Sequence, residues 1–221
     1  MHSIFHDFLH ALTHADKGIF LLFKYLTIQP GKIAREYVDG RRKKYFNPFS
    51  FLVLMVGVTF FLILKFEKFA LRHEDFRYGN REIILFSFKY FNVLIFLMCP
   101  VSALLSWLLF RKYKFFYAEH LVLWAYLTGQ QMFYMCLGIV PLCLDILLGF
   151  IPLSVTITVW TILINIWIAF GLIQFHHTKS LADLVKVIIV VVLSQILLQG
   201  MVYFGLYLFG ASLSQLSNQD S

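Results

Sequence analysis

Charged residues are scarce in this chain, and their scarcity sets its class. Only 14% of the 221 residues are charged, whereas 60% are hydrophobic and 18% are aromatic. The mean hydropathy is +0.76. This composition excludes an ordinary soluble domain and predicts an integral membrane protein.

Catalytic motifs are also lacking. The sequence has no HExxH, no GxSxG and no nucleotide-binding loop, so we expect no enzymatic activity. An intramembrane enzyme stays open as the weakest reading, and it would depend on Glu119 and His120. The three cysteines, Cys99, Cys136 and Cys143, lack CxxC spacing and are expected to be small core residues. We expect no cofactor, and a bound metal ion stays open.

Long hydrophobic runs are abundant, and each transmembrane helix needs about 20 residues. The runs predict an all-α fold, a polytopic membrane helix bundle with N-terminal interfacial amphipathic helices. Residues 1–46 are expected to form an amphipathic, basic membrane-surface region, residues 47–210 the transmembrane bundle and residues 211–221 a polar tail. The five predicted spans lie at about 48–64, 91–110, 121–140, 153–175 and 187–209.

The connection at residues 141–152 contains two prolines and the isolated Asp145. Proline removes a helical hydrogen bond, and irregular backbone within a membrane must be shielded by protein. This segment therefore predicts a broken helix end or a short re-entrant turn.

Basic residues predict the orientation of the spans. With five spans, thirteen of the 19 Lys and Arg lie on the side of the N-terminus and six on the other side. The positive-inside rule then predicts a cytoplasmic N-terminus and an external C-terminus. Arg41, Arg42, Lys43 and Lys44 directly precede the first span, where each can contribute about 1 kcal/mol of attraction to anionic headgroups. The net charge of +7 therefore indicates lipid contact, and no nucleic-acid partner is needed to explain it.

Four histidines, His2, His6, His10 and His14, recur at intervals of four near the N-terminus. On a helix they share a polar face with Asp7, opposite an apolar arc, which favours a helix lying at the membrane interface. Two alternatives stay open: a metal site using His10, His14 and Asp7, and a pH-sensitive lipid contact. The full set of candidate metal-binding or pH-sensing residues is His6, His10, His14, Asp7, His176 and His177.

Glu119 and His120 form the candidate functional pair. Ionisable groups within a span commonly mark a proton relay or a binding site. Their predicted place at the cytoplasmic edge of the third span, near Lys114, also allows a purely structural salt bridge. His176, His177 and Asp183 are expected on the same side, so a cluster of histidines and carboxylates is sterically conceivable.

Residues 16–48 carry a spaced motif. Asp16 and Gly18 are followed by Pro30-Gly31, Glu36-Tyr37, Gly40-Arg41, Tyr45 and Pro48, and later by Tyr117-Ala118-Glu119-His120-Leu121-Val122. This pattern resembles bacterial membrane proteins of domain-of-unknown-function family 3667. The resemblance implies a bacterial inner membrane protein and gives no biochemical role. Many relatives begin with a zinc ribbon of paired cysteines, which this chain lacks, and Tyr126 stands where relatives tend to have a histidine.

Uncharged polar residues within the spans predict hydrogen bonds between helices. They are Thr128, Gln130, Gln131, Asn165, Gln195 and Gln199. Gln130 and Gln131 point in different directions, so one of them could line a permeation path.

We expect a non-catalytic membrane scaffold or accessory component that assembles with itself or with a membrane partner. The alternative is a small proton- or metal-linked transporter or channel centred on Glu119 and His120.

Overall fold

The computed structural model describes residues 19–70, 81–148, 152–178 and 180–217. The predicted His2, His6, His10 and His14 face, with Asp7, Asp16 and Gly18, lies outside these residues. A helix spans Ile19–Ile28. It is followed by α2 (Pro30–Val38), the 3-10 turn η1 (Arg42–Lys44), α3 (Pro48–Ala70), α4 (Arg81–Leu109), the 3-10 turn η3 (Arg111–Tyr113), α5 (Tyr117–Leu148), α6 (Leu153–His176) and α7 (Leu181–Ser217).

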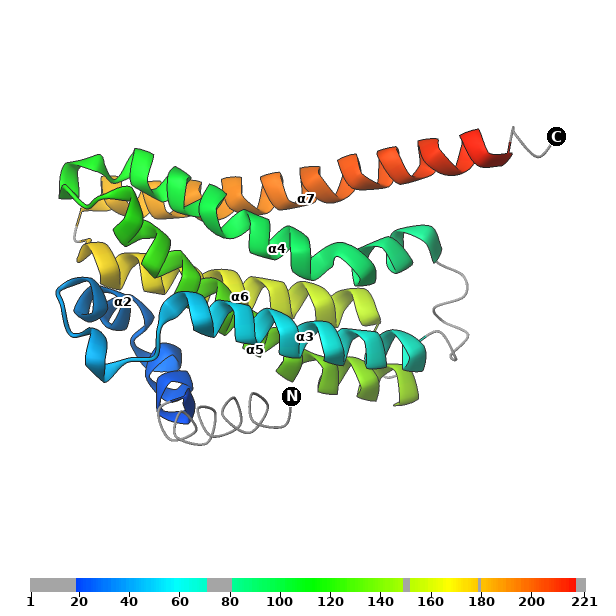
Figure 1. Ribbon diagram of the computed structural model, residues 1–221, viewed down its shortest axis with the longest axis horizontal. Coiled ribbons are helices and arrows are strands. Elements are labelled where there is room, and N and C mark those ends of the chain that lie inside the picture. Colours follow the sequence, from blue (N-terminus) through cyan, green and yellow to red (C-terminus); the bar gives the residue numbers. More distant parts are fainter. Residues whose placement is uncertain (1–18, 71–80, 149–151, 179, 218–221) are drawn as a thin grey trace, which may run out of the picture.

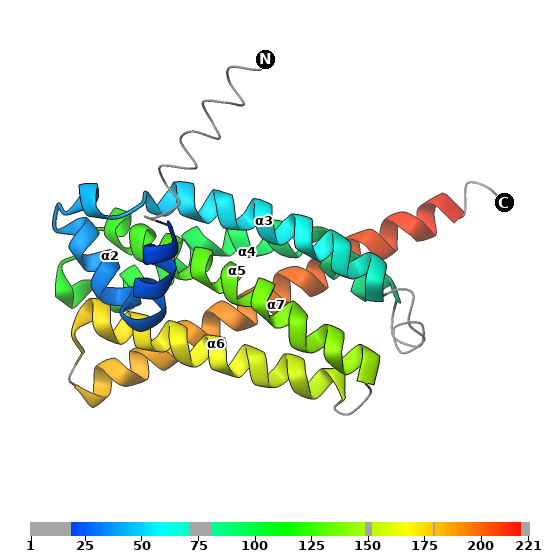
Figure 2. The same cartoon turned by 90° about the horizontal axis from the view of Figure 1, so that it is seen from below.

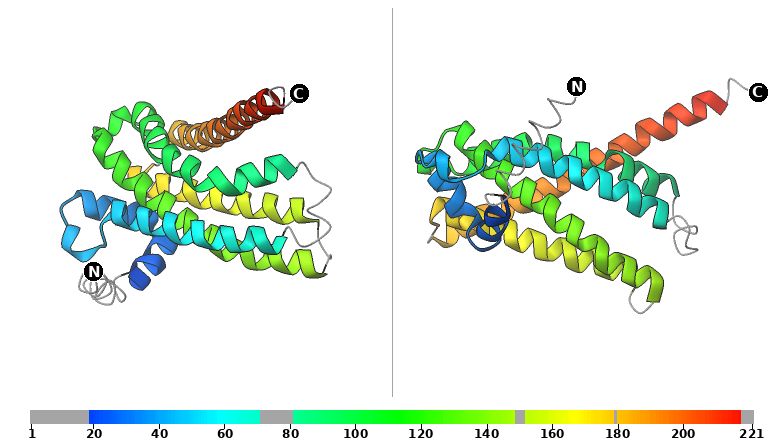
Figure 3. Two further views of the ribbon diagram at one scale, coloured as in Figure 1. Left: turned by 45° about the vertical axis from the view of Figure 1, so that its right-hand side comes forward. Right: turned by 60° about the horizontal axis from the view of Figure 1, so that its bottom comes forward.

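The long helices α3 to α7 run alongside one another, while the helix Ile19–Ile28 and α2 lie across one end of the bundle (Figures 1 and 2). We call this end, which also holds η1, η3 and the turn between α6 and α7, the α2 end. The opposite, far end is where α3 and α5 finish, and α7 continues past the other helices there (Figure 3). Helix α5 is central, since it contacts α2, α3, α4 and α6.

The fold class is confirmed as an all-helical membrane bundle. The residue range of each predicted span falls mainly within one long helix of the structure. Within the described residues, four helical segments are long and apolar enough to cross a membrane: Arg42–Phe69, Tyr117–Leu148, Ser154–His176 and Leu181–Gly205. The apolar segment within α4, Val93–Leu109, is shorter. A mainly apolar surface on the bundle therefore faces lipid.

The helix break predicted at Pro141 is wrong, because α5 continues through Pro141 to Leu148. A proline inside a helix removes one hydrogen bond, and neighbouring helices can tolerate that loss within a bundle. Pro152 occupies the N-cap position of α6. Asp145 accepts a hydrogen bond from Thr156 (Oδ2 to Oγ1, 2.5 Å), so it links α5 to α6.

The N-terminal described helices are packed into the bundle. Leu22, Leu26, Ile33 and Ala34 are buried. Residues 19–38 were expected to lie on the membrane surface, and this stays a prediction: one set of their apolar side chains packs against protein, whereas Phe20, Leu21 and Ile28 are exposed. An amphipathic helix serves either purpose, and the sequence pattern does not distinguish lipid from a neighbouring helix.

Candidate functional site

Two buried histidines meet at the α2 end. His120 lies in the first turn of α5 and is 0% exposed, and His176 is the last residue of α6 and is 1% exposed. Their ring centroids are 5.2 Å apart. Because α5 and α6 are antiparallel neighbours, the start of one helix lies beside the end of the other. We call these two residues the histidine pair.

The His120 ring is held by a serine of the neighbouring helix α4. Its Nδ1 lies 2.9 Å from Ser106 Oγ. That hydroxyl donates to Ala103 O (3.0 Å) and accepts from Trp124 Nε1 (2.9 Å). Since the single hydroxyl proton is directed to Ala103, Nδ1 of His120 carries the hydrogen that is donated to Ser106. The Nε2 atom of the neutral ring is then an acceptor.

His176 is held in the same tautomer. Its Nδ1 donates to the carbonyl oxygen of Leu172 (2.9 Å), since a carbonyl can only accept. The Nε2 atoms of His120 and His176 are both buried and make no hydrogen bond with the described residues. The pair therefore offers two lone pairs in a protein interior, each able to accept a proton.

Aromatic rings enclose the pair and limit access to it. Phe110 stacks on His176 with a centroid distance of 4.1 Å, and Phe175 and Phe115 approach His120 at 5.9 and 6.3 Å. The guanidinium of Arg35, from α2, lies 5.2 Å from the Phe115 centroid. Burial lowers the pKa of Arg35 from its usual value, while Asp39 opposes that shift.

A charged cluster closes the α2 end beside the pair. Asp183 accepts hydrogen bonds from Lys112 Nζ (2.6 Å) and from the Tyr113 hydroxyl (2.8 Å). The Tyr113 ring lies 5.4 Å from that of His176. Burial and then the hydrogen bond to Asp183 raise the pKa of Tyr113, and the hydrogen bond to Asp183 raises that of Lys112. Lys112 is exposed, so this cluster joins the buried pair to the aqueous side.

The predicted Glu119 and His120 pair does not form one site. The Glu119 carboxylate accepts the backbone N–H of Phe116 (Oε2 to N, 2.7 Å), which caps the start of α5. His177 is exposed and ends α6 in the left-handed conformation (φ 49°). Among the described residues, no three His, Cys, Asp or Glu side chains gather where a metal ion could bind.

Sequence reasoning missed Ser106, Trp124 and Arg35 as neighbours of the pair. One signal was available: His120 and Trp124 are four residues apart and share a helical face. Their common partner Ser106 belongs to another span, and no local pattern connects that residue to them.

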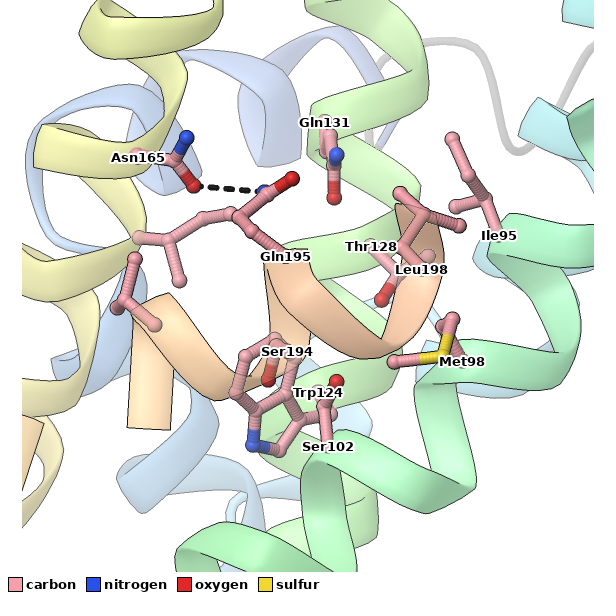
Figure 4. Close-up of a pocket in the computed structure, with 12 residues that line it drawn as sticks. Ile95, Met98, Ser102, Trp124, Thr128, Gln131, Asn165, Ser194, Gln195 and Leu198 are labelled. Atoms are coloured by element: carbon pink, nitrogen blue, oxygen red, sulfur yellow. Dashed lines mark hydrogen bonds between the residues drawn. The ribbon is translucent and has the colours of Figure 1, made fainter. Parts of the chain in front are cut away.

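Polar side chains continue from the pair into the bundle. Trp124 lines a small cavity of about 30 Å³, enough for a water molecule. Figure 4 shows Ser102, Thr128, Gln131 and Ser194 around it. Asn165 accepts a hydrogen bond from Gln195 (Oδ1 to Nε2, 2.8 Å) at one side of this cavity (Figure 4).

A larger cavity of about 620 Å³ lies toward the far end. Gln131, Asn165 and Gln195 line both cavities. Gln130 instead donates to Thr27 Oγ1 (3.1 Å) and fastens the N-terminal helix. Of the two adjacent glutamines, Gln131 is therefore the one that lines the interior.

The motif residues of the N-terminal segment build the corner between α2 and α3. Glu36 accepts from Tyr45 Oη (2.7 Å) and from Lys44 Nζ (3.3 Å), and it also pairs with Arg41 (3.3 Å). Gly40 has a positive φ of 100°, which favours glycine. All four predicted lipid-contacting cations are exposed, and two of them, Arg41 and Lys44, also pair with Glu36.

Other motif residues place α2 and α3 against the bundle. Pro30 begins α2 and Pro48 begins α3, where Asn47 Oδ1 accepts the backbone N–H of Phe49 (2.9 Å). Tyr37 meets Tyr126 edge to face (5.8 Å between centroids), and the Tyr126 hydroxyl donates to Phe46 O (2.6 Å). The motif therefore has a structural explanation throughout its described part.

The fold and the buried polar groups define a polytopic membrane helix bundle with an internal histidine pair. Residues 16–60 match the model of a family described as "Protein of unknown function (DUF3667)". The resemblance carried by the N-terminal motif is thereby confirmed over that segment. No curated protein and no solved structure matches the chain.

Proposed function

We propose that this membrane protein moves protons, as a small proton-linked transporter or channel in which His120 and His176 exchange the proton. The observation that carries the proposal is the pair of buried Nε2 atoms that find no hydrogen-bond partner in the described part of the chain, on rings whose centroids are 5.2 Å apart. An imidazole ring can take up a proton at one nitrogen and release one from the other, and buried ionisable groups in membrane proteins commonly form proton relays.

The surrounding polar groups support a route to and from the pair. On one side, Tyr113 contacts His176 and is hydrogen-bonded to Asp183 at the α2 end. On the other side, Ser106 joins His120 to Trp124, beside the small cavity. Water in that cavity would extend the route toward Gln131 and the larger cavity.

The scaffold reading has less support. Among the described residues, the Nε2 atoms of His120 and His176 are two ring nitrogens without a partner that face the same small region, and a scaffold assigns no role to that arrangement. As proposed, the protein is not an enzyme and has no resident cofactor. It resides in a bacterial inner membrane with the α2 end in the cytoplasm, where exposed Arg42 and Lys43 meet anionic headgroups.

The test is proton flux into vesicles that contain the purified protein. A potassium diffusion potential drives protons inward, and a trapped pH-sensitive dye records the initial rate. We expect a rate above that of protein-free vesicles, and a fall of at least about tenfold in His120→Gln and in His176→Gln, because each removes a proton-accepting group.

Glu119→Gln is the matched control, since Glu119 caps α5 outside the pair and its variant should keep the flux. Thermal unfolding of all variants separates lost function from lost fold. Equal rates with and without protein, or full flux in both folded histidine variants, would contradict the proposal.

A further inference from the structure

Neither His120 nor His176 lines the larger cavity. It is a partly open space of about 620 Å³ between α3, α5, α6 and α7, in the half of the bundle away from α2, and its lining includes the exposed side chains of Ile157 and Tyr203. Ligand sites in proteins commonly measure about 300–1,000 Å³. The space therefore suits a small organic molecule.

The lining of the cavity restricts the charge of its occupant. Phe66, Met135, Leu142 and Trp160 contribute apolar surface. None of the described side chains that line it is charged. An ion would lose its hydration there without gaining a counter-ion, so the occupant is uncharged.

The inner wall of the cavity can bind a polar head. Gln131, Asn165 and Gln195 meet there, and one hydrogen bond of 2.8 Å joins the last two. Each primary amide has two donor hydrogens and an oxygen with two lone pairs, so a single bond leaves further donors and acceptors on both residues. A hydroxyl or amide group placed against this wall can both donate and accept.

The geometry points to a binding site for an uncharged amphipathic molecule, with its hydroxyl or amide head at Asn165 and Gln195 and its hydrocarbon body along Phe66 and Leu142. The inference that this molecule is the solute transported with the proton rests on the proposed function. The inference that the molecule binds rests on the cavity alone and is tested separately.

The experiment measures equilibrium binding of radiolabelled 1-monodecanoylglycerol to the purified full-length protein in lipid nanodiscs. Unlabelled decanoate and decyltrimethylammonium compete for the same site with the same chain and with opposite charges. We expect saturable binding of the neutral probe, at least about tenfold tighter than that of either ion. Binding that does not saturate, or equal competition by an ion, would overturn the inference.

Two adjacent positions on α6 provide a matched pair of variants. Thr161 lines the cavity, whereas Ile162 is 52% exposed and does not line it. Thr161→Trp fills the cavity and should weaken binding by at least about tenfold, while Ile162→Trp should leave it unchanged. Equal effects of the two substitutions would overturn the site.

A double variant tests the polar head. Asn165→Leu/Gln195→Leu removes both partners of one hydrogen bond, so neither is left unsatisfied and the fold should persist. We expect weaker binding of 1-monodecanoylglycerol and unchanged binding of decane, which has no head. Equally weakened binding of both probes in a folded variant would refute the assignment of the polar head to this wall.

The two proposals fail separately. His120→Gln and His176→Gln should keep probe binding, since neither residue lines the cavity. Saturable binding without proton flux would overturn the proposed function and support this site. Proton flux without saturable binding would support the proposed function and overturn this site.

Discussion

At the scale of single residues, Ser106 decides how the histidine pair is held. Its hydroxyl is the shared partner of His120 Nδ1 and Trp124 Nε1, both in α5. Ser106→Ala leaves those two buried donors without an acceptor, so we expect a loss of about 1–3 kcal/mol in the free energy of unfolding. Urea unfolding in detergent measures it, with Ser154→Ala on the exposed surface of α6 as the matched control. Equal stability of the two variants would contradict this role.

A second single residue, Glu36, makes the stability of the α2 end depend on pH. The hydrogen bond from Tyr45, ahead of those from Lys44, lowers the pKa of Glu36. A lowered folded-state pKa stabilises the protein above the unfolded pKa of about 4.3, and this stability is lost as the pH falls through the folded value. We expect Tyr45→Phe to make that acid loss smaller and to complete it at a higher pH, because the folded-state pKa of Glu36 moves toward its unfolded value, whereas Tyr25→Phe should follow the wild type. The unfolding midpoints of both variants and of the wild type, measured from pH 6 downward in steps of about one pH unit, record the difference between them.

At the scale of elements, the contact between α2 and α6 depends on two glycines. A Cβ added at Gly31 would clash with the backbone of Gly171 and lie 2.7 Å from Gln174 Cβ. The Gly31 N–H also donates to Gln174 Oε1 (3.2 Å). We expect Gly31→Ala to cost at least about 1–3 kcal/mol, because the backbone cannot yield as a flexible side chain would. Gly57→Ala in α3, where a Cβ meets nothing within 4 Å, should be neutral or stabilising in the same unfolding measurement.

The helices also show which features a sequence can predict. Span positions follow from local hydrophobic runs, so α3 and α6 begin at or near their predicted first residues. The role of Glu119 depends on where α5 begins, and the path through Pro141 depends on neighbouring helices. The meeting of His120 with His176 requires the packing of α5 against α6, which no local pattern specifies. Composition and periodicity thus define elements, while the site arises from contacts between them.

At the scale of the whole molecule, the five long helices place the two ends of the described chain at opposite ends of the bundle (Figure 1). Lys112 is exposed at the α2 end, and Ser154 is exposed near the far end. If the α2 end is cytoplasmic, as the basic residues predict, then only the far end faces the exterior. Under the proposed function, this orientation also determines which side supplies protons to Tyr113 and the histidine pair.

Thiol labelling of intact cells tests this orientation. Cys99, Cys136 and Cys143 are first replaced by alanine, since all three are free thiols. A membrane-impermeant maleimide should then label Ser154→Cys in intact cells and Lys112→Cys only after the membrane is opened. The opposite pattern would place the α2 end outside. Protons would then enter the proposed route from the exterior at that end. Labelling of both positions in intact cells would mean that the helices between them do not cross the bilayer as a bundle, because Lys112 and Ser154 are separated by α5 and the start of α6.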